Sequence, residues 1–132
     1  MYHIKALDLN IGDEVLVSSI TDPGTLNAIV IAGLKPKLVD SGTRTFNTTP
    51  SEIESRLSPN TKALVLVHSV GQALDMSAIL NLVKGKGILI LEDCSQAHGA
   101  STKEGCLVGS YGDVAAFSTM YRKASITGPC GG

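Results

Sequence analysis

The sequence contains no tryptophan, and its three tyrosines and two phenylalanines make up only 4% of the 132 residues. Excess charge of one sign is also missing, because 11 lysines and arginines nearly balance 12 acidic residues and leave a net charge of −1. Without a basic excess there is no electrostatic footprint for binding nucleic acid. The three cysteines form no C-x-x-C pair. We therefore expect no disulfide framework and no structural zinc site, and we expect a reducing cytoplasm.

Long hydrophobic runs are absent as well. The apolar stretches fall well short of the roughly 18 residues that a membrane span needs. Residues 1–9 include Lys5 and Asp8 and lack the apolar core of a secretion signal, so we expect no membrane association. Hydrophobic residues nevertheless make up 43% of the chain, which is enough to bury a core and excludes a disordered protein.

Short apolar runs of strand length alternate with helix-like stretches along the chain. Strands are predicted at residues 14–17, 37–39, 63–67, 88–91 and 114–117, and helices at residues 25–32, from residue 50 onward and at residues 75–84. Thr49 and Asp75 are the expected N-caps of the second and third helices. Strands that are apolar on both faces are typical of parallel sheets covered by helices. The sequence therefore predicts the α/β class, with a mostly parallel sheet flanked by helices.

Open α/β sheets bind ligands beyond the carboxyl ends of their strands, so the residues that follow each strand are the candidates for chemistry. Glu92 and Asp93 follow the most apolar strand, where two carboxylates must be paired, hydrogen-bonded or solvated. Their spacing leaves two interpretations open: a helix cap or salt bridge, or a carboxylate that meets a cationic ligand atom. Lys123 follows the last strand, and its spacing alone indicates a solvated surface residue.

Three further residues near the strand ends could carry chemistry. His68 and His98 could be metal ligands, but no partner lies at metal-ligand spacing, which favours a hydrogen-bonding structural role for both. Cys94 could be a nucleophile, yet no histidine is paired with it locally, so we interpret it as a small buried residue. The sequence contains neither the G-x-G-x-x-G dinucleotide fingerprint nor a P-loop.

Four pieces of the sequence carry a resemblance, at residues 12–40, 67–76, 92–100 and 109–118. The most specific is E-D-C-S-Q-A-H-G-A at residues 92–100. In order and spacing they resemble motifs of the DegT/DnrJ/EryC1/StrS family of sugar aminotransferases, and the resemblance covers essentially the whole chain. It implies the aspartate-aminotransferase fold, called fold type I, and dependence on pyridoxal 5'-phosphate.

The resemblance also implies roles for four residues. Asp93 would pair with the protonated pyridine nitrogen of pyridoxal phosphate and keep the ring able to accept electrons. Gln96 would lie near the phenolic oxygen of the cofactor, and Ser118 would contact its phosphate. Lys123, six residues after Phe117, would hold the cofactor covalently, which requires its amine to lose a proton.

The chain departs from the family pattern at several places. Asp22 stands where the family often has an aromatic residue that stacks on the pyridine ring. Residues 120–122 (M-Y-R) replace the usual aromatic-proline run, and the turn at residues 127–132 lacks the common acidic residue before the glycine pair. The matched motifs include neither the upstream loop with which the family binds the cofactor phosphate nor its C-terminal small domain. Residues 1–132 are therefore predicted to be a fragment, a partial cofactor-binding large domain.

For the complete protein, the resemblance implies an aminotransferase that moves an amine to a nucleotide-linked keto sugar. Glutamate is the usual amino-acid donor in the family, and a homodimer is the usual assembly. Two alternatives remain open. One is a related sugar dehydratase that uses pyridoxamine phosphate, although those relatives replace the lysine by histidine and Lys123 argues against it. The other is a non-catalytic protein, a truncated or decayed copy of such an enzyme, and the isolated fragment is expected to be inactive.

Overall fold

The computed structural model describes residues 2–128, and its centre is a five-stranded sheet. The strands are β1 (Glu14–Ser18), β2 (Lys35–Val39), β3 (Thr61–Val67), β4 (Leu89–Asp93) and β5 (Val114–Ala116). They lie in the order β2-β1-β3-β4-β5, and each neighbouring pair is parallel. The α/β class and the parallel sheet predicted from the sequence are confirmed.

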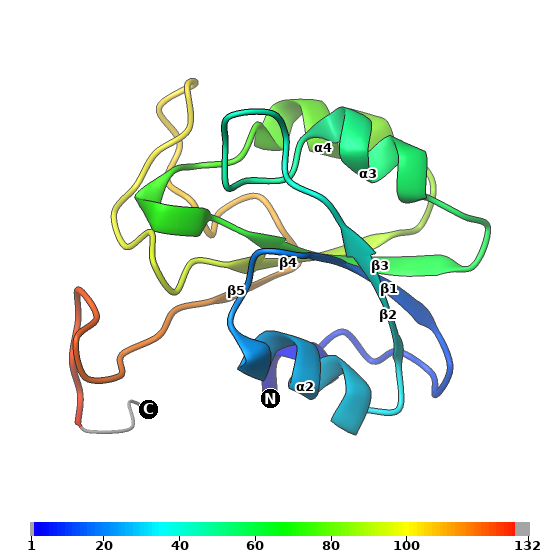
Figure 1. The fold of residues 1–132 in the computed structure, drawn as a ribbon, viewed down its shortest axis with the longest axis horizontal. Helices are drawn as coiled ribbons and strands as arrows, with labels where there is room; N and C mark the ends of the chain where they lie inside the picture. The colour runs from blue at the N-terminus through cyan, green and yellow to red at the C-terminus, as the bar shows by residue number, and fades with distance from the viewer. Residues whose placement is uncertain (1, 129–132) are drawn as a thin grey trace.

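Helices cover both faces of this sheet (Figure 1). The short α1 (Tyr2–Lys5) and α2 (Pro23–Ile31) lie on one face, whereas α3 (Pro50–Arg56) and α4 (Met76–Val83) lie on the other. A 3-10 turn, η1 (Ser69–Gly71), follows β3. Within the described residues, no helix has both the length and the apolar character needed to span a membrane.

Local sequence explains where the longer helices begin. Thr49 caps α3 as predicted, because its hydroxyl accepts a hydrogen bond from the Glu52 N–H at 3.4 Å. Asp75 caps α4 through the same kind of contact. α2 begins two residues earlier than predicted, because Asp22 is its N-cap and Pro23 is its first residue. The apolar pattern did not predict α1, which has only four residues.

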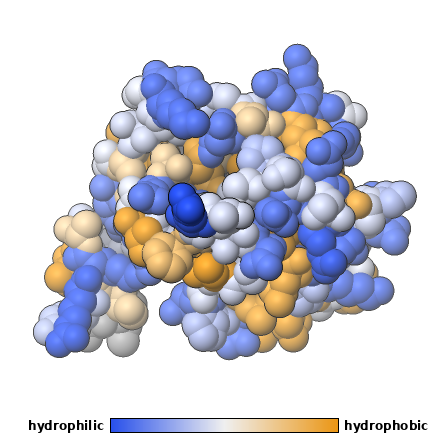
Figure 2. Space-filling view, turned by 45° about the horizontal axis from the view of Figure 1, so that its top comes forward, coloured by the Kyte–Doolittle hydropathy of each residue, from blue (hydrophilic) through white to orange (hydrophobic). Residues whose placement is uncertain are grey.

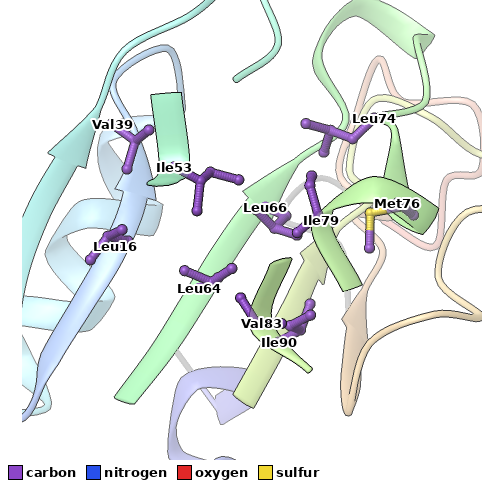
Figure 3. Packing of buried hydrophobic residues seen from close by; sticks show 10 residues of the cluster. All are labelled: Leu16, Val39, Ile53, Leu64, Leu66, Leu74, Met76, Ile79, Val83 and Ile90. Carbon is purple, nitrogen blue, oxygen red and sulfur yellow. The ribbon is translucent and has the colours of Figure 1, made fainter. Parts of the chain in front are cut away.

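Apolar side chains fill the space on both sides of the sheet. The cluster on the α3 and α4 side draws its buried residues from both layers (Figure 3): Leu16, Val39, Ile53, Leu64, Leu66, Leu74, Met76, Ile79, Val83 and Ile90. A second cluster lies between the sheet and the pair α1 and α2. The outer surface on the α3 and α4 side carries hydrophilic side chains with smaller apolar areas between them (Figure 2). Burial on both faces explains the continuous apolar runs within the central strands β1, β3 and β4.

The connections create a topological switch point between β1 and β3. From β1 the chain crosses through α2 to β2 on one side, and it then returns to β3 on the other side of β1. Connections that leave in opposite directions open a crevice beyond the carboxyl ends of the two strands, which is where open α/β sheets bind ligands. Residues 117–128 continue from the carboxyl end of β5 as an arm that stands out from the body (Figure 1).

Candidate functional site

A cavity of about 800 Å³ lies at the carboxyl edge of the sheet, on the face covered by α2. Its wall includes four side chains that the sequence predicted for one site: Asp93, Gln96, Ser118 and Lys123. They come from the end of β4, the loop after it and the arm after β5. The fold therefore brings all four predicted site residues around one cavity, while their individual roles stay predictions.

Asp93 ends β4 with its carboxylate held on the α2 side. Successive side chains of a strand point to opposite faces, so Asp93 faces α2 and Glu92 faces the layer of α3 and α4. Thr25 Oγ1, in the first turn of α2, donates to Asp93 Oδ2 at 3.2 Å, and the Ser95 N–H donates to Oδ1 at 3.0 Å. These two contacts fix the orientation of the carboxylate and leave lone pairs on both oxygens for a further donor.

Glu92 takes the structural role that the sequence left open for the acidic pair. Its carboxylate is fully buried, and Oε2 accepts hydrogen bonds from His68 Nε2 at 3.0 Å and the Gly109 N–H at 2.9 Å. Oε1 accepts from the N–H groups of Tyr111 at 2.8 Å and Gly112 at 2.7 Å. Burial alone raises the pKa of Glu92, but these four hydrogen bonds outweigh it and lower the pKa to about 2. Glu92 is therefore an anion that ties the loop before β5 to the sheet.

His68 and Cys94 lie beside Glu92, close enough together for the three to hold a metal ion. His68 is not available as a ligand, because Nδ1 accepts from the Leu74 N–H at 3.1 Å, which assigns the ring proton to Nε2 for Glu92. Burial, together with the charges of Glu92 and Asp93, raises the pKa of Cys94 to about 12, so its thiol stays protonated. The structural interpretation of His68 and Cys94 is confirmed.

His98 differs from the prediction. It was expected to hydrogen-bond, but within residues 2–128 both of its ring nitrogens are buried without a partner. The ring instead packs against Phe117 in a T-shaped arrangement, with 5.3 Å between the ring centroids and 65° between the ring planes. His98 therefore takes an aromatic packing role in place of the expected hydrogen-bonding one.

Gln96 is oriented by the turn that follows β3. Its Oε1 accepts a hydrogen bond from the Val70 N–H at 3.1 Å, which leaves the two amide hydrogens of Gln96 for a ligand oxygen. Val70 has a φ of +50°, in the left-handed region that β-branched residues rarely adopt. Asn47 holds the turn, since its Oδ1 accepts from the Ser69 N–H at 2.8 Å and its Nδ2 donates to the Gln72 carbonyl at 2.9 Å.

Asp22 also borders the cavity, at the N-terminus of α2. Its Oδ1 accepts a hydrogen bond from the Gly24 N–H at 2.7 Å, so the residue that replaces the expected aromatic serves as a helix cap. Phe46 and Phe117 border the cavity as well, with 55% and 41% of their surface exposed. Aromatic surface is therefore available at the cavity from other parts of the chain.

The residues around the cavity fit pyridoxal phosphate. A held carboxylate at Asp93 suits the ring nitrogen, the free amide hydrogens of Gln96 suit the phenolic oxygen, and the half-buried Lys123 offers a primary amine. Thr21 and Ser69 border the cavity, and their buried hydroxyl oxygens have no hydrogen-bond partner in the described part of the chain. Such groups are usually satisfied in folded proteins, so polar ligand atoms are expected nearby.

Sequence reasoning missed Thr25 and Ser69 as site residues. Thr25 lies in the first turn of α2, the helix after β1, and Ser69 lies two residues beyond the end of β3. The rule that ligands bind at the carboxyl ends of strands is the signal that could have found both, had it been extended a few residues further along the chain.

Residues 1–132 match the sequence profile of the DegT/DnrJ/EryC1/StrS aminotransferase family. The chain is 43% identical over 87% of its length to the dTDP-3-amino-3,6-dideoxy-alpha-D-galactopyranose transaminase of Aneurinibacillus thermoaerophilus, and 38% identical over 97% to the GDP-perosamine synthase of Escherichia coli O157:H7. An aminotransferase structure from Psychrobacter cryohalolentis matches 96% of the chain with a TM-score of 0.89 at 37% identity. The chain spans 31%, 35% and 32% of these three proteins, about a third of each.

Proposed function

Because the chain belongs to the DegT/DnrJ/EryC1/StrS aminotransferase family, whose enzymes depend on pyridoxal phosphate, we propose that it carries cofactor-binding residues of a sugar aminotransferase. The polypeptide would transfer an amine, from glutamate as donor, to a nucleotide-linked keto sugar. The observation that carries the proposal is that Asp93, Gln96, Ser118 and Lys123 all border the same cavity. Residues 1–132 would form part of the large domain. The phosphate-binding loop and the small domain would lie elsewhere in the polypeptide, and two copies would form a homodimer.

Asp93 and Gln96 would bind and orient the cofactor ring. When bound, pyridoxal phosphate supplies an electron sink for the carbon atom that exchanges its amine. Asp93 would accept a hydrogen bond from the protonated ring nitrogen and keep that nitrogen positive. Because Thr25 and Ser95 already hold both carboxylate oxygens, the carboxylate needs no rearrangement when charge develops. Gln96 would donate an amide hydrogen to the phenolic oxygen, and Ser118 would contact the phosphate.

Lys123 supplies a primary amine at the cavity wall. Its Nζ would hold the cofactor covalently and, once the amine of the donor has displaced it, would carry a proton between the donor carbon and the cofactor. A sugar dehydratase of the same family is less well supported, because the family resemblance implies a histidine in those relatives where this chain has Lys123.

Lys123→Arg in the polypeptide that carries this chain tests the proposal. A guanidinium is not deprotonated in proteins, so the variant should lose the visible absorbance of covalently held cofactor and the transfer of amine from glutamate to a nucleotide-linked keto sugar. Lys103→Arg is the matched control, because Lys103 is exposed and lies 3.5 Å from Asp75 outside the cavity. Asp93→Asn should keep the covalent attachment and slow the transfer by orders of magnitude. Full activity in Lys123→Arg would contradict the proposal.

A further inference from the structure

We propose that Ser69 is a further cofactor contact, and that its hydroxyl donates a hydrogen bond to the phenolic oxygen of pyridoxal phosphate beside Gln96. The inference rests on the proposed function, because the place of the cofactor is taken from Asp93, Gln96 and Lys123. No motif in the sequence assigns a role to residue 69. Burial, position and the hydrogen bonds of the surrounding turn support the assignment.

Ser69 lies at the topological switch point, two residues beyond β3. It is 4% exposed and borders the cavity, and its Oγ has no hydrogen-bond partner among residues 2–128. A buried hydroxyl without a partner is unfavourable. Serine changes its staggered rotamer by rotation about a single bond, so an oxygen atom of a ligand in the cavity can complete the missing hydrogen bond.

The turn after β3 places Ser69 next to Gln96. Val70, the following residue, donates its N–H to Gln96 Oε1 at 3.1 Å, which joins the two segments at one wall of the cavity. Asn47 fixes the turn with two hydrogen bonds: its Oδ1 accepts from the Ser69 N–H at 2.8 Å, and its Nδ2 donates to the Gln72 carbonyl at 2.9 Å. The left-handed conformation of Val70, with a φ of +50°, is strained and persists only where the surroundings impose it. Because the backbone next to Ser69 is bonded to Gln96, the Ser69 hydroxyl and the amide hydrogens of Gln96 would meet the same part of a ligand in the cavity.

Thr48 offers a comparison within the same chain. Its Oγ1 is also buried without a partner in the described structure, and the residue is 4% exposed, but Thr48 does not border the cavity. An unpartnered hydroxyl alone therefore does not define a ligand contact. The position of Ser69 at the cavity, beside Gln96, distinguishes the two residues.

Ser69→Ala in the full polypeptide, with Thr48→Val as the matched control, tests the inference. Pyridoxal phosphate is titrated to give its Kd, and the visible absorbance of the bound cofactor is followed against pH. Loss of a hydrogen bond to the anionic phenolic oxygen should raise the Kd about tenfold or more. The pH midpoint of the absorbance change should also rise, because the anionic oxygen loses a donor. Thr48→Val should change neither value, and Ser69→Thr, which keeps the hydroxyl, should restore both.

The melting temperature of the cofactor-free protein provides a third measurement. Ser69→Ala removes a hydroxyl that has no partner in the described structure, so the Tm should not fall, whereas a purely structural role would lower it. A wild-type Kd and pH midpoint in Ser69→Ala, a lowered Tm, or the same changes in Thr48→Val would overturn the inference and leave the proposed function standing. If the wild-type polypeptide binds no pyridoxal phosphate, the proposed function itself fails, and this inference fails with it.

Discussion

Replacing Glu92 by glutamine removes a buried negative charge and keeps the size of the side chain. The carboxylate accepts two hydrogen bonds at each oxygen, from His68 Nε2 and the Gly109 N–H at Oε2, and from the Tyr111 and Gly112 N–H groups at Oε1. A glutamine side chain must point its NH2 group at one of these two pairs of donors. Because the NH2 group can only donate, both hydrogen bonds at that position are lost. His68 cannot adapt by moving its proton, because its other ring nitrogen already accepts a hydrogen bond.

Two arguments give the size of the effect. Hydrogen bonds to charged groups contribute about 1.5–3 kcal/mol each, so the loss of two costs about 3–6 kcal/mol. The pKa of Glu92 is lowered from 4.5 to about 2, which corresponds to about 3 kcal/mol at about 1.36 kcal/mol per pH unit. We therefore expect Glu92→Gln to lower the free energy of unfolding by about 3–5 kcal/mol at neutral pH.

The effect of Glu92→Gln should also depend on pH. The pKa of Glu92 is lower in the folded state, so its contribution to stability is complete above pH 4.5 and is lost as the pH falls toward 2. Urea titrations of the chain near neutral pH and in acid should show the gap between wild type and variant closing in that window. Glu54→Gln on the exposed surface of α3 is the control, with an expected change within about 0.5 kcal/mol. A Glu92→Gln effect no larger than the control, or a gap that does not narrow in acid, would refute the reasoning.

Gly112→Ala should destabilise the fold by about 1–3 kcal/mol in thermal unfolding, because an added Cβ would lie 2.8 Å from the backbone oxygen of Ile90. Cys94 should resist alkylation at mildly alkaline pH until the protein unfolds, whereas the exposed Cys106 reacts, because burial raises the Cys94 pKa to about 12. Peptide mapping by mass spectrometry distinguishes the two cysteines, and early modification of Cys94 would contradict its assignment. The 132-residue chain alone should bind pyridoxal phosphate weakly, because the proposal places the phosphate-binding loop elsewhere in the polypeptide. A stoichiometric visible band that survives dialysis would count against that placement.

The sheet could be predicted from the sequence, because the central strands β1, β3 and β4 contain apolar runs, and burial on both faces leaves little room for other residue types there. The start of α2 was harder to predict, because Asp22 and Pro23 suit a turn as well as a helix N-terminus. α1 could not be predicted, because four residues form no stable helix alone. It depends on the packing of Ile4 against the sheet, which is a tertiary contact.

The strand itself does not reveal which residue of the acidic pair serves the site. The two residues before Glu92 and Asp93 are both apolar, so the alternation along β4 marks neither face as polar. The contacts that separate the two carboxylates join distant segments, from Thr25 to Asp93 across 68 positions and from Gly109 to Glu92 across 17. Only the folded structure brings these partners together, and the same holds for Ser69 and the side chain of Asn47.

The identity of the lysine that holds the cofactor tests the central claim most directly. The polypeptide that carries this chain is loaded with pyridoxal phosphate, reduced with borohydride and digested, and the pyridoxyl group is located by mass spectrometry. We predict the label on Lys123, at the cavity that Asp93 also borders. A label on Lys62, Lys84 or Lys103, or the absence of any label, would contradict the assignment.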